Sequence, residues 1–434
     1  MKKITRATLL ILTLFCFTYS LSAKEFLTLE KIKVQAATAT PEKYPDSDDV
    51  LLDNFIQTEY QADGTSDSWD DTAVKILTEK GKRANRTMSL SFNVAYGTNY
   101  FSIVQLIKPD GTLIEIDAAG NSKVMVDPSQ MSANIYNPNS KVLNLSIPGL
   151  EIGDTLRYVI HRVRHKTVVP DTFSDYQTFE GSTPYERMTY QIIAPKERPL
   201  VKIALKSEIP DTVKFTEEKS EQDTKIVYTW EVKNVPRMFD EPDMPMRYTV
   251  VQRLLVSTMK NWEDLSKWYW ELCKPRLDAT TPEMEAMAKK LVEGATNTTQ
   301  KIDAIFNFVS QDIRYMGITT EEEAPGYEPH DVSITFENRY GVCRDKAALL
   351  AAMLRIVDIE AFPVIIMAGP KKDEEVPQPF FNHAVTAALG DNGNYILMDS
   401  TDENTKDIFP TYLQNMSYIV ARPEGETLLT SPII

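Results

Sequence analysis

The stretch RYGVCRDKAALLAAML, residues 339–354, decides how the C-terminal half of this chain folds. It places Cys343, one of only three cysteines in 434 residues, between a glycine-containing turn and a segment with helical periodicity. Apolar residues recur at helical spacing and predict a buried helix face: Ala347, Leu350, Ala351 and Leu354. Because a helix N-terminus stabilises a thiolate through its free backbone N–H groups, Cys343 is placed to act as a nucleophile.

A thiol nucleophile needs a base, normally a histidine, and a third group that orients the histidine. His383 begins the predicted strand HAVTAAL, Asp399 ends the predicted strand NYILMDS, and the turn sequence GDNGN separates them. If Leu389 pairs with Gly393 across a three-residue loop, His383 and Asp399 lie directly opposite each other on one face. The sequence therefore predicts that a cysteine, a histidine and an acid meet. By contrast, we expect His330, in the loop before the helix, at the surface, with a place at the border of the active-site cleft as the alternative.

Helical patterns followed by strands indicate an α+β domain over residues 250–415. Helices are predicted around 261–272, from Pro282 with Thr281 as its cap, around 302–309, and after Cys343. The strands FPVIIMAG, HAVTAAL and NYILMDS follow. Residues 416–434 form a C-terminal segment that contains the strand pattern SYIVA.

Residues 50–245 read as an antiparallel β-sandwich. Short β-branched or aromatic segments predict its strands: SLSFNVAYG, YFSIVQLI, TLIEID, TLRYVIHRV, RMTYQIIA and KIVYTWEV. Pro109-Asp110-Gly111 predicts a hairpin turn between the second and third of these. Residues 24–49 lack clear periodicity and are expected to be a lead-in segment.

Residues 1–23 have the order of a secretory signal peptide, with basic residues, an apolar run and a small-residue cleavage site. An uncleaved anchor is the alternative. Cleavage predicts a protein exported to the periplasm or outside the cell, with no integral membrane span in the mature chain. It removes three positive charges and moves the net charge from −15 to −18, which argues against nucleic acid or an anionic membrane surface as partner.

Two cysteines remain after cleavage, Cys273 and Cys343. A disulfide between them is the alternative to a reactive Cys343 thiol.

Three stretches around these residues resemble the transglutaminase-like branch of the papain-like cysteine enzymes: RYGVCRDKAALLAAMLR, FNHAVTAAL and YILMDST. The N-terminal half is similar to the domain of unknown function DUF3857, through IKPDGT, IPGLEIGDTLRY and TWEVKNVP. The transglutaminase-like resemblance implies that Cys343 is the nucleophile, His383 the general base and acid, and Asp399 its orienting group. It also implies that Tyr315, in DIRYMGI, helps to hold the oxyanion, and the related bacterial pattern has Asp or Gln where this chain has Val342.

Two functions follow as hypotheses. The first is a cysteine enzyme that acts on the amide bonds of a peptide, protein or other substrate, as a peptidase, amidase or transglutaminase, without a metal or organic cofactor. The second is a binding or scaffold protein that uses its β-rich half to hold a glycan, peptide or protein. Selective reactivity of the Cys343 thiol would distinguish the two. The oligomeric state is not predicted.

Overall fold

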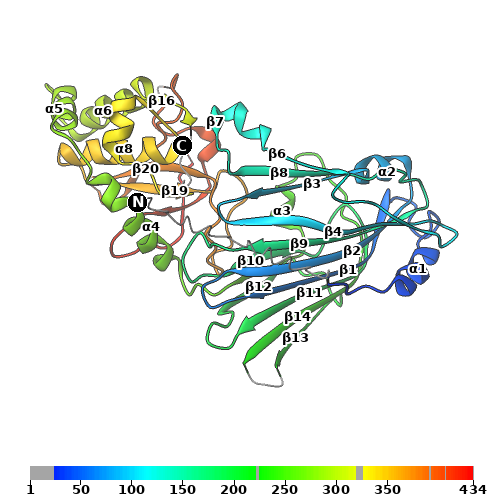
Figure 1. Ribbon diagram of the computed structural model, residues 1–434. Coiled ribbons are helices and arrows are strands. Elements are labelled where there is room, and N and C mark those ends of the chain that lie inside the picture. Colours follow the sequence, from blue (N-terminus) through cyan, green and yellow to red (C-terminus); the bar gives the residue numbers. More distant parts are fainter. Residues whose placement is uncertain (1–23, 221–223, 319–325, 391, 406, 434) are drawn as a thin grey trace, which may run out of the picture.

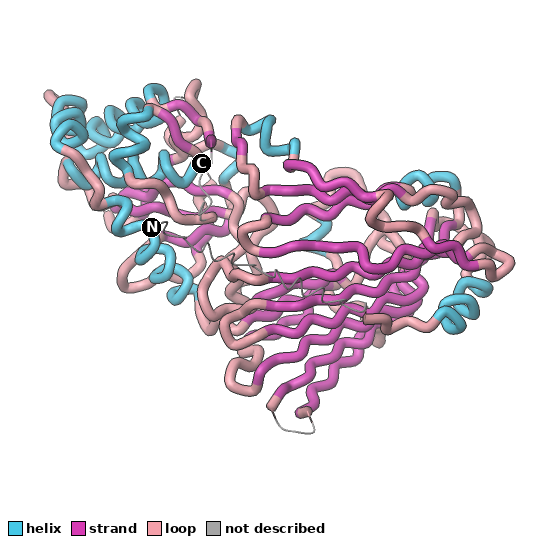
Figure 2. The backbone as a smooth tube through the Cα atoms, viewed as in Figure 1, coloured by secondary structure: helices cyan, strands magenta, loops and turns pink. Residues whose placement is uncertain are grey.

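The computed structural model describes residues 24–220, 224–318, 326–390, 392–405 and 407–433. The predicted signal peptide, residues 1–23, lies outside the described residues. Most of the helices gather at one end of the molecule and a long β-rich part forms the other, as Figure 1 and Figure 2 show. This arrangement is the predicted α+β fold, with a β-rich N-terminal part and an α+β C-terminal part.

An eight-stranded sheet forms the centre of the β-rich part, in the order β13-β14-β11-β1-β2-β9-β4-β5. Its strands are β1 (Asp49–Tyr60), β2 (Ser66–Ile76), β4 (Gly97–Ile107), β5 (Leu113–Glu115), β9 (Thr155–Arg164), β11 (Tyr185–Pro195), β13 (Val213–Lys219) and β14 (Lys225–Val235). The turn Pro109-Asp110-Gly111 joins β4 to β5, as predicted. However, β1 pairs with β11 in parallel, so a purely antiparallel sheet is wrong. Strand directions depend on which strands become neighbours, and distant neighbours such as these leave no signal in local sequence.

Two three-stranded sheets cover one face of the large sheet. One has the order β3-β8-β6 and consists of β3 (Thr87–Asn93), β8 (Ser140–Ser146) and β6 (Ser122–Val126). The other has the order β10-β15-β12 and consists of β10 (Ser174–Thr178), β15 (Arg253–Ser257) and β12 (Lys202–Lys206). Val74 packs with Leu143 beneath the first sheet, and Ile56 packs with Leu254 beneath the second. Ile56 pairs with Asp70 of β2, and Asp70 is four residues from Val74 on the same strand. Because every second residue of a strand points to the same face, Ile56 and Val74 lie on one face of the large sheet, and so do the two small sheets that pack against them.

The opposite face of the large sheet is covered by the start of the described chain. Residues 24–49, the predicted lead-in segment, contain the helix α1 (Leu29–Thr38), which the sequence analysis did not predict. Ile32 is the only buried residue of this helix, so the helix has no broad apolar face that a sequence pattern could reveal. Ile32 packs with Leu52 and Ala73 of the large sheet. Because consecutive strand residues point to opposite faces, Ala73 and Val74 show that α1 and the small sheets lie on opposite sides.

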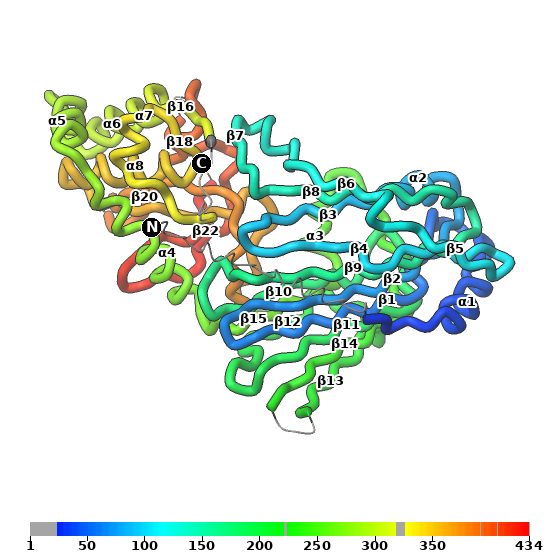
Figure 3. The backbone as a smooth tube through the Cα atoms, in the orientation of Figure 1, coloured from blue at the N-terminus to red at the C-terminus, as the bar shows by residue number. Residues whose placement is uncertain are grey.

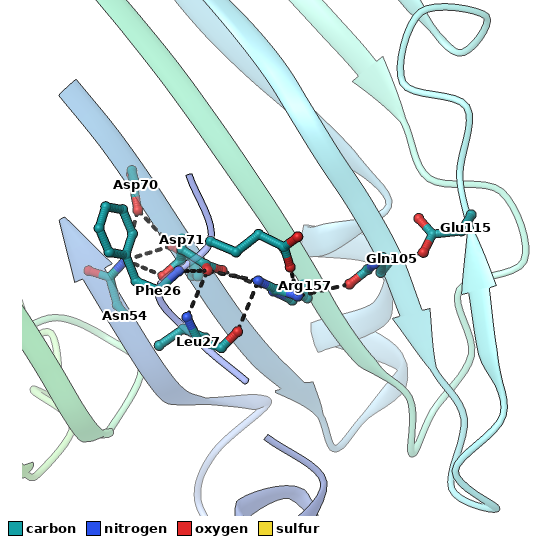
Figure 4. A network of polar contacts seen from close by, with 10 residues as sticks. Phe26, Leu27, Asn54, Asp70, Asp71, Gln105, Glu115 and Arg157 are labelled. Atoms are coloured by element: carbon teal, nitrogen blue, oxygen red, sulfur yellow. Dashed lines mark hydrogen bonds and ion pairs between the residues drawn. The ribbon is translucent and has the colours of Figure 1, made fainter. Parts of the chain in front are cut away.

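A buried ion pair fastens this N-terminal segment, as Figure 4 shows. Arg157 on β9 and Asp71 on β2 both have no exposed side-chain surface, and Arg157 donates two hydrogen bonds to Asp71, at 3.0 and 2.8 Å. Asp71 also accepts the backbone N–H groups of Phe26 and Leu27, each at 3.0 Å. Arg157 in turn donates to the Leu27 carbonyl and to Gln105. Residues 26 and 27 therefore supply part of the hydrogen bonding of both buried charges.

The C-terminal part places helices on a five-stranded antiparallel sheet of order β21-β20-β19-β22-β23. The strands are β19 (Ala361–Ile366), β20 (His383–Leu389), β21 (Tyr395–Met398), β22 (Ser417–Val420) and β23 (Leu429–Thr430). The helices are α4 (Trp262–Leu277), α5 (Pro282–Leu291), α6 (Thr298–Asp312), α7 (Val332–Asn338) and α8 (Cys343–Ile356). Thr281 caps α5 as predicted, by accepting the Met284 N–H. The predicted strand SYIVA is β22, and it pairs with β19, so the segment 416–434 completes this sheet.

Short elements complete the chain: α2 (Glu79–Asn85), η1 (Pro128–Ala133), β7 (Ile135–Tyr136), α3 (Arg247–Val250), β16 (Arg314–Tyr315), β17 (Gly317–Ile318), β18 (Tyr340–Gly341) and η2 (Thr411–Leu413). Figure 3 shows the C-terminal part at one end of the strands of the β-rich part. Strand β7 of the β-rich part pairs with β17 of the C-terminal part, so the two are joined by backbone hydrogen bonding. Within the described parts of the chain, no helix is long and apolar enough to cross a lipid bilayer.

Candidate active site

Cys343 is the first residue of α8, as the sequence predicts. The residue before it, Val342, is extended, and its N–H donates to the Asp345 carboxylate at 3.0 Å. Asp345 therefore fixes the first turn of the helix, and the residues from Ala347 to Leu354 bury the helix against the sheet. The Cys343 thiol is half-buried and free, and Cys273 on α4 is free and fully buried, so the two do not form a disulfide.

His383 and Asp399 meet beside this thiol. The His383 Nε2 atom lies 2.9 Å from the Asp399 Oδ2 atom, and both side chains are largely buried. The Asp399 Oδ1 atom accepts the Thr401 N–H at 3.0 Å and the Thr401 hydroxyl at 2.7 Å. Tyr412 donates its hydroxyl to Asp399 Oδ2 at 3.0 Å. These bonds hold the carboxylate in one orientation toward the imidazole.

The predicted strand register behind this pair is wrong by two residues. In the structure Leu389 pairs with Tyr395 and Thr386 with Met398, so His383 and Asp399 are not directly opposite each other. The ladder between β20 and β21 ends before it reaches either residue. Because side chains alternate with a period of two, the offset still leaves both side chains on the same face, and they meet diagonally.

The His383 side chain and the Ala384 backbone lie next to the Cys343 sulfur and act on the pKa of its thiol through hydrogen bonding. Since His383 Nε2 faces Asp399, the other ring nitrogen, Nδ1, faces the sulfur. Burial raises the pKa of the Cys343 thiol, but the bond and charge of His383, with the charge of Arg344, lower the pKa below its ordinary value.

The same contacts act on the histidine in the opposite direction. Burial lowers the pKa of His383, whereas its bonds to Asp399 and Cys343 raise the pKa above its ordinary value. Burial raises the pKa of Asp399, but its bond to His383 lowers the pKa below the usual range. The arrangement thus favours a thiolate beside an imidazolium, with the carboxylate behind it.

Tyr315, on β16, also reaches the sulfur. Its hydroxyl lies next to the Cys343 thiol and the Cys343 backbone N–H, and burial raises the pKa of this hydroxyl. Its own N–H donates to Glu403 at 2.7 Å, which fixes the backbone at this point. The structure therefore brings together all four residues that the sequence singled out.

The sequence reasoning missed several residues that support the site. His330, expected at the surface, is half-buried, and its Nδ1 atom lies 3.0 Å from Asp345 Oδ1. Lys346 is fully buried behind Cys343, where its ammonium group donates to the carbonyls of Ser310 and Ile313 and burial lowers its pKa to about 8. The triplet Arg344-Asp345-Lys346 gives no sign of this burial in the sequence, because sequence alone does not show which charges have buried partners.

No group of three or more His, Cys, Asp or Glu residues in the described ranges is arranged to hold an ion. The expectation that no cofactor is needed stays a prediction.

A cysteine at a helix tip, paired through histidine with an acid on a neighbouring sheet, is the arrangement that defines the papain-like class of folds. Residues 285–400 match the family model of the transglutaminase-like superfamily, and residues 62–239 match the model of DUF3857, a domain of unknown function. Residues 285–400 thus form a transglutaminase-like domain, and a DUF3857 domain precedes it in the chain.

A solved structure shares the fold over most of this chain. A protein named "putative protease" from Parabacteroides distasonis superposes with a TM-score of 0.68 at 17% identity, over 89% of this chain and 72% of the other. A "putative cysteine protease" from Cytophaga hutchinsonii matches with a TM-score of 0.24 at 16% identity, over 53% of this chain and 74% of the other. The first similarity shows the fold alone, and the second is too low to carry an argument. No curated protein matches the chain.

Proposed function

We propose that this protein is an exported cysteine enzyme that cleaves amide bonds through a thioester on Cys343. The observation that carries the proposal is the chain of contacts from the Cys343 sulfur through the His383 ring to the Asp399 carboxylate. A lowered thiol pKa and a raised imidazole pKa are what nucleophilic catalysis by cysteine requires.

In the proposed reaction the Cys343 thiolate attacks the carbonyl carbon of an amide, and the carbonyl oxygen becomes an oxyanion. The Cys343 N–H and the Tyr315 hydroxyl lie together beside the sulfur and would donate to this oxyanion. His383 then gives its proton to the departing amine as the C–N bond breaks, which leaves a thioester and a neutral imidazole. Asp399 keeps the imidazole in place throughout.

The thioester is resolved by water or by a primary amine, from which His383 removes a proton. Water gives hydrolysis or deamidation, and an amine gives a new amide bond. We favour hydrolysis because it needs no second binding site for an acceptor. Export rests on the signal-like order of residues 1–23.

The test compares wild type with Cys343→Ala on a mixed peptide library, with and without added primary amine. Wild type is expected to release hydrolysed or deamidated products, and Cys343→Ala is expected to release none, because the sulfur forms the covalent bond. Mass spectrometry of the products separates hydrolysis, deamidation and amine transfer by their mass changes. Equal turnover by both forms, or no turnover by either, would contradict the proposal and would favour a binding or scaffold role.

A further inference from the structure

A cleft opens on the covered face of the large sheet, between the two small sheets. It has a volume of about 660 Å³, within the range of sites that hold ligands. Its floor crosses four adjacent strands, β1, β2, β9 and β4, through Thr58, Ser68, Arg162 and Asn99. At the usual spacing between strands this floor is roughly 14 Å wide, about the length of four residues of extended chain.

One wall of the cleft reaches the cysteine side of the candidate active site. Tyr96, which lines the cleft, approaches Gly326 so closely that a Cβ atom on this glycine would lie 2.8 Å from the tyrosine hydroxyl. The Gly326 carbonyl accepts a hydrogen bond from Arg344 at 3.2 Å, and Arg344 directly follows Cys343. Tyr96 and Arg344 thus both contact Gly326, which connects the cleft to the N-terminus of α8.

The other wall reaches the histidine side. Tyr176, a half-exposed residue of the cleft, lies edge-on to Phe380, with ring centroids 6.4 Å apart, and Phe380 precedes His383 by three residues. Next to it, the Asp175 carbonyl accepts a hydrogen bond from Gln378 at 2.8 Å. Arg253 of β15 contacts the connection between β19 and β20, in which Gln378 and Phe380 also lie. It donates to Asp373 at 2.9 and 3.2 Å, and both side chains are buried.

The cleft therefore contacts, on its two sides, the chain segments that carry Cys343 and His383. We propose that this cleft of the DUF3857 domain binds an extended polypeptide segment of the substrate and presents an amide next to that segment to Cys343. This inference rests on the proposed function for the cleavage of the amide at Cys343, but binding of a peptide in the cleft does not require that cleavage.

The side chains of the cleft suit a polypeptide. Its carboxylates are already engaged, because Asp70 accepts from Arg162 at 3.1 Å and Asp175 accepts from the Tyr190 hydroxyl at 2.8 Å. Uncharged groups that both donate and accept line much of the rest: Ser66, Ser68, Ser91, Asn93 and Asn99. Such groups match the alternating N–H and C=O groups of an extended backbone, and the ring of Tyr176 offers a surface for an apolar side chain.

The test blocks the cleft with Ser68→Trp. Ser68 is half-buried in the floor, where its hydroxyl accepts from Thr58 at 2.9 Å, so an indole there fills the space. Thr87→Trp, at an exposed position on β3 outside the cleft, is the matched control. Each substitution is made in the Cys343→Ala background, and binding of an equimolar library of random decapeptides is measured by ultrafiltration and mass spectrometry. Thermal unfolding verifies that each variant is folded.

We expect Cys343→Ala to retain a subset of decapeptides, Ser68→Trp to lower that retention at least tenfold, and Thr87→Trp to leave it unchanged. In the wild-type background, Ser68→Trp should change the rate at which iodoacetamide alkylates Cys343 by less than twofold. Such a result shows that the active site is intact. Unchanged retention in a folded Ser68→Trp variant overturns the inference. Retention of no decapeptide overturns it too, as does retention of chito- or cello-oligosaccharides instead. Cleft-dependent retention without any turnover by wild type would refute the proposed function and leave the binding site standing.

Discussion

Replacing His383 with alanine is expected to reduce amide cleavage by about 10³-fold or more, which is the usual contribution of a general base and acid. The side chain has two tasks in the proposed reaction. It stabilises the Cys343 thiolate by hydrogen bonding and charge, and it protonates the departing amine. Loss of the ring therefore lowers both the fraction of thiolate and the rate of C–N bond breaking.

The measurement is the initial rate on a peptide that wild type processes, over a range of pH. His165→Ala removes an exposed histidine from the β-rich domain and serves as the control, with an expected rate equal to wild type. Both variants should unfold at the wild-type temperature within a few degrees. A His383→Ala enzyme that keeps more than a tenth of the wild-type rate would remove His383 from the mechanism.

The second large effect concerns stability. Asp71→Ala is expected to lower the free energy of unfolding by about 3–5 kcal/mol, because it leaves the Arg157 charge buried with little compensation. Glu25, the other carboxylate close to Arg157, lies at 3.1 Å but is more than half exposed. The N–H groups of Phe26 and Leu27 lose their acceptor as well, so the N-terminal segment should detach from the sheet.

Urea unfolding of the full chain, followed by circular dichroism and tryptophan fluorescence, measures this loss. Asp240→Ala is the matched control, since it removes an exposed ion pair with Arg247 and should cost about 1 kcal/mol or less. Asp71→Leu combined with Arg157→Met should be more stable than Asp71→Ala, because no charge is then left buried alone. An Asp71→Ala protein as stable as the control would mean that the ion pair does not fasten this segment.

The sequence predicted the C-terminal part of the fold better than the N-terminal part. Helices α4, α5, α6 and α8 follow apolar periodicity and capping, as with Thr281 and Pro282, which are local signals. Strands β1 and β2, at the centre of the large sheet, were not singled out because their sequences carry Asp53, Asn54, Asp70 and Asp71. These polar groups are buried and bonded to partners far along the chain, which local patterns do not reveal.

The candidate site was predictable to the level of residue identity. Cys343 and His383 stood out because each begins a regular element, and Asp399 stood out because it directly follows one. The strand register was wrong because the turn sequence GDNGN allows more than one three-residue loop, and only the structure selects the one between Gly390 and Asn394. Tyr412 and Glu403 could not be found from the sequence. Tyr412 lies in the short helix η2 and Glu403 in an irregular segment after β21, and both contact the site only through the fold.

The pH dependence of the reaction between iodoacetamide and Cys343 tests the central claim most directly. A pKa below the ordinary thiol range means that the thiolate persists as the pH falls, and the raised pKa of His383 keeps the imidazolium beside it through neutral pH. We expect rapid alkylation of Cys343 at pH 6, with no reaction at Cys273, whose pKa is raised by burial. Alkylation of Cys343 that begins only near pH 8.5, as for an ordinary thiol, would contradict the account.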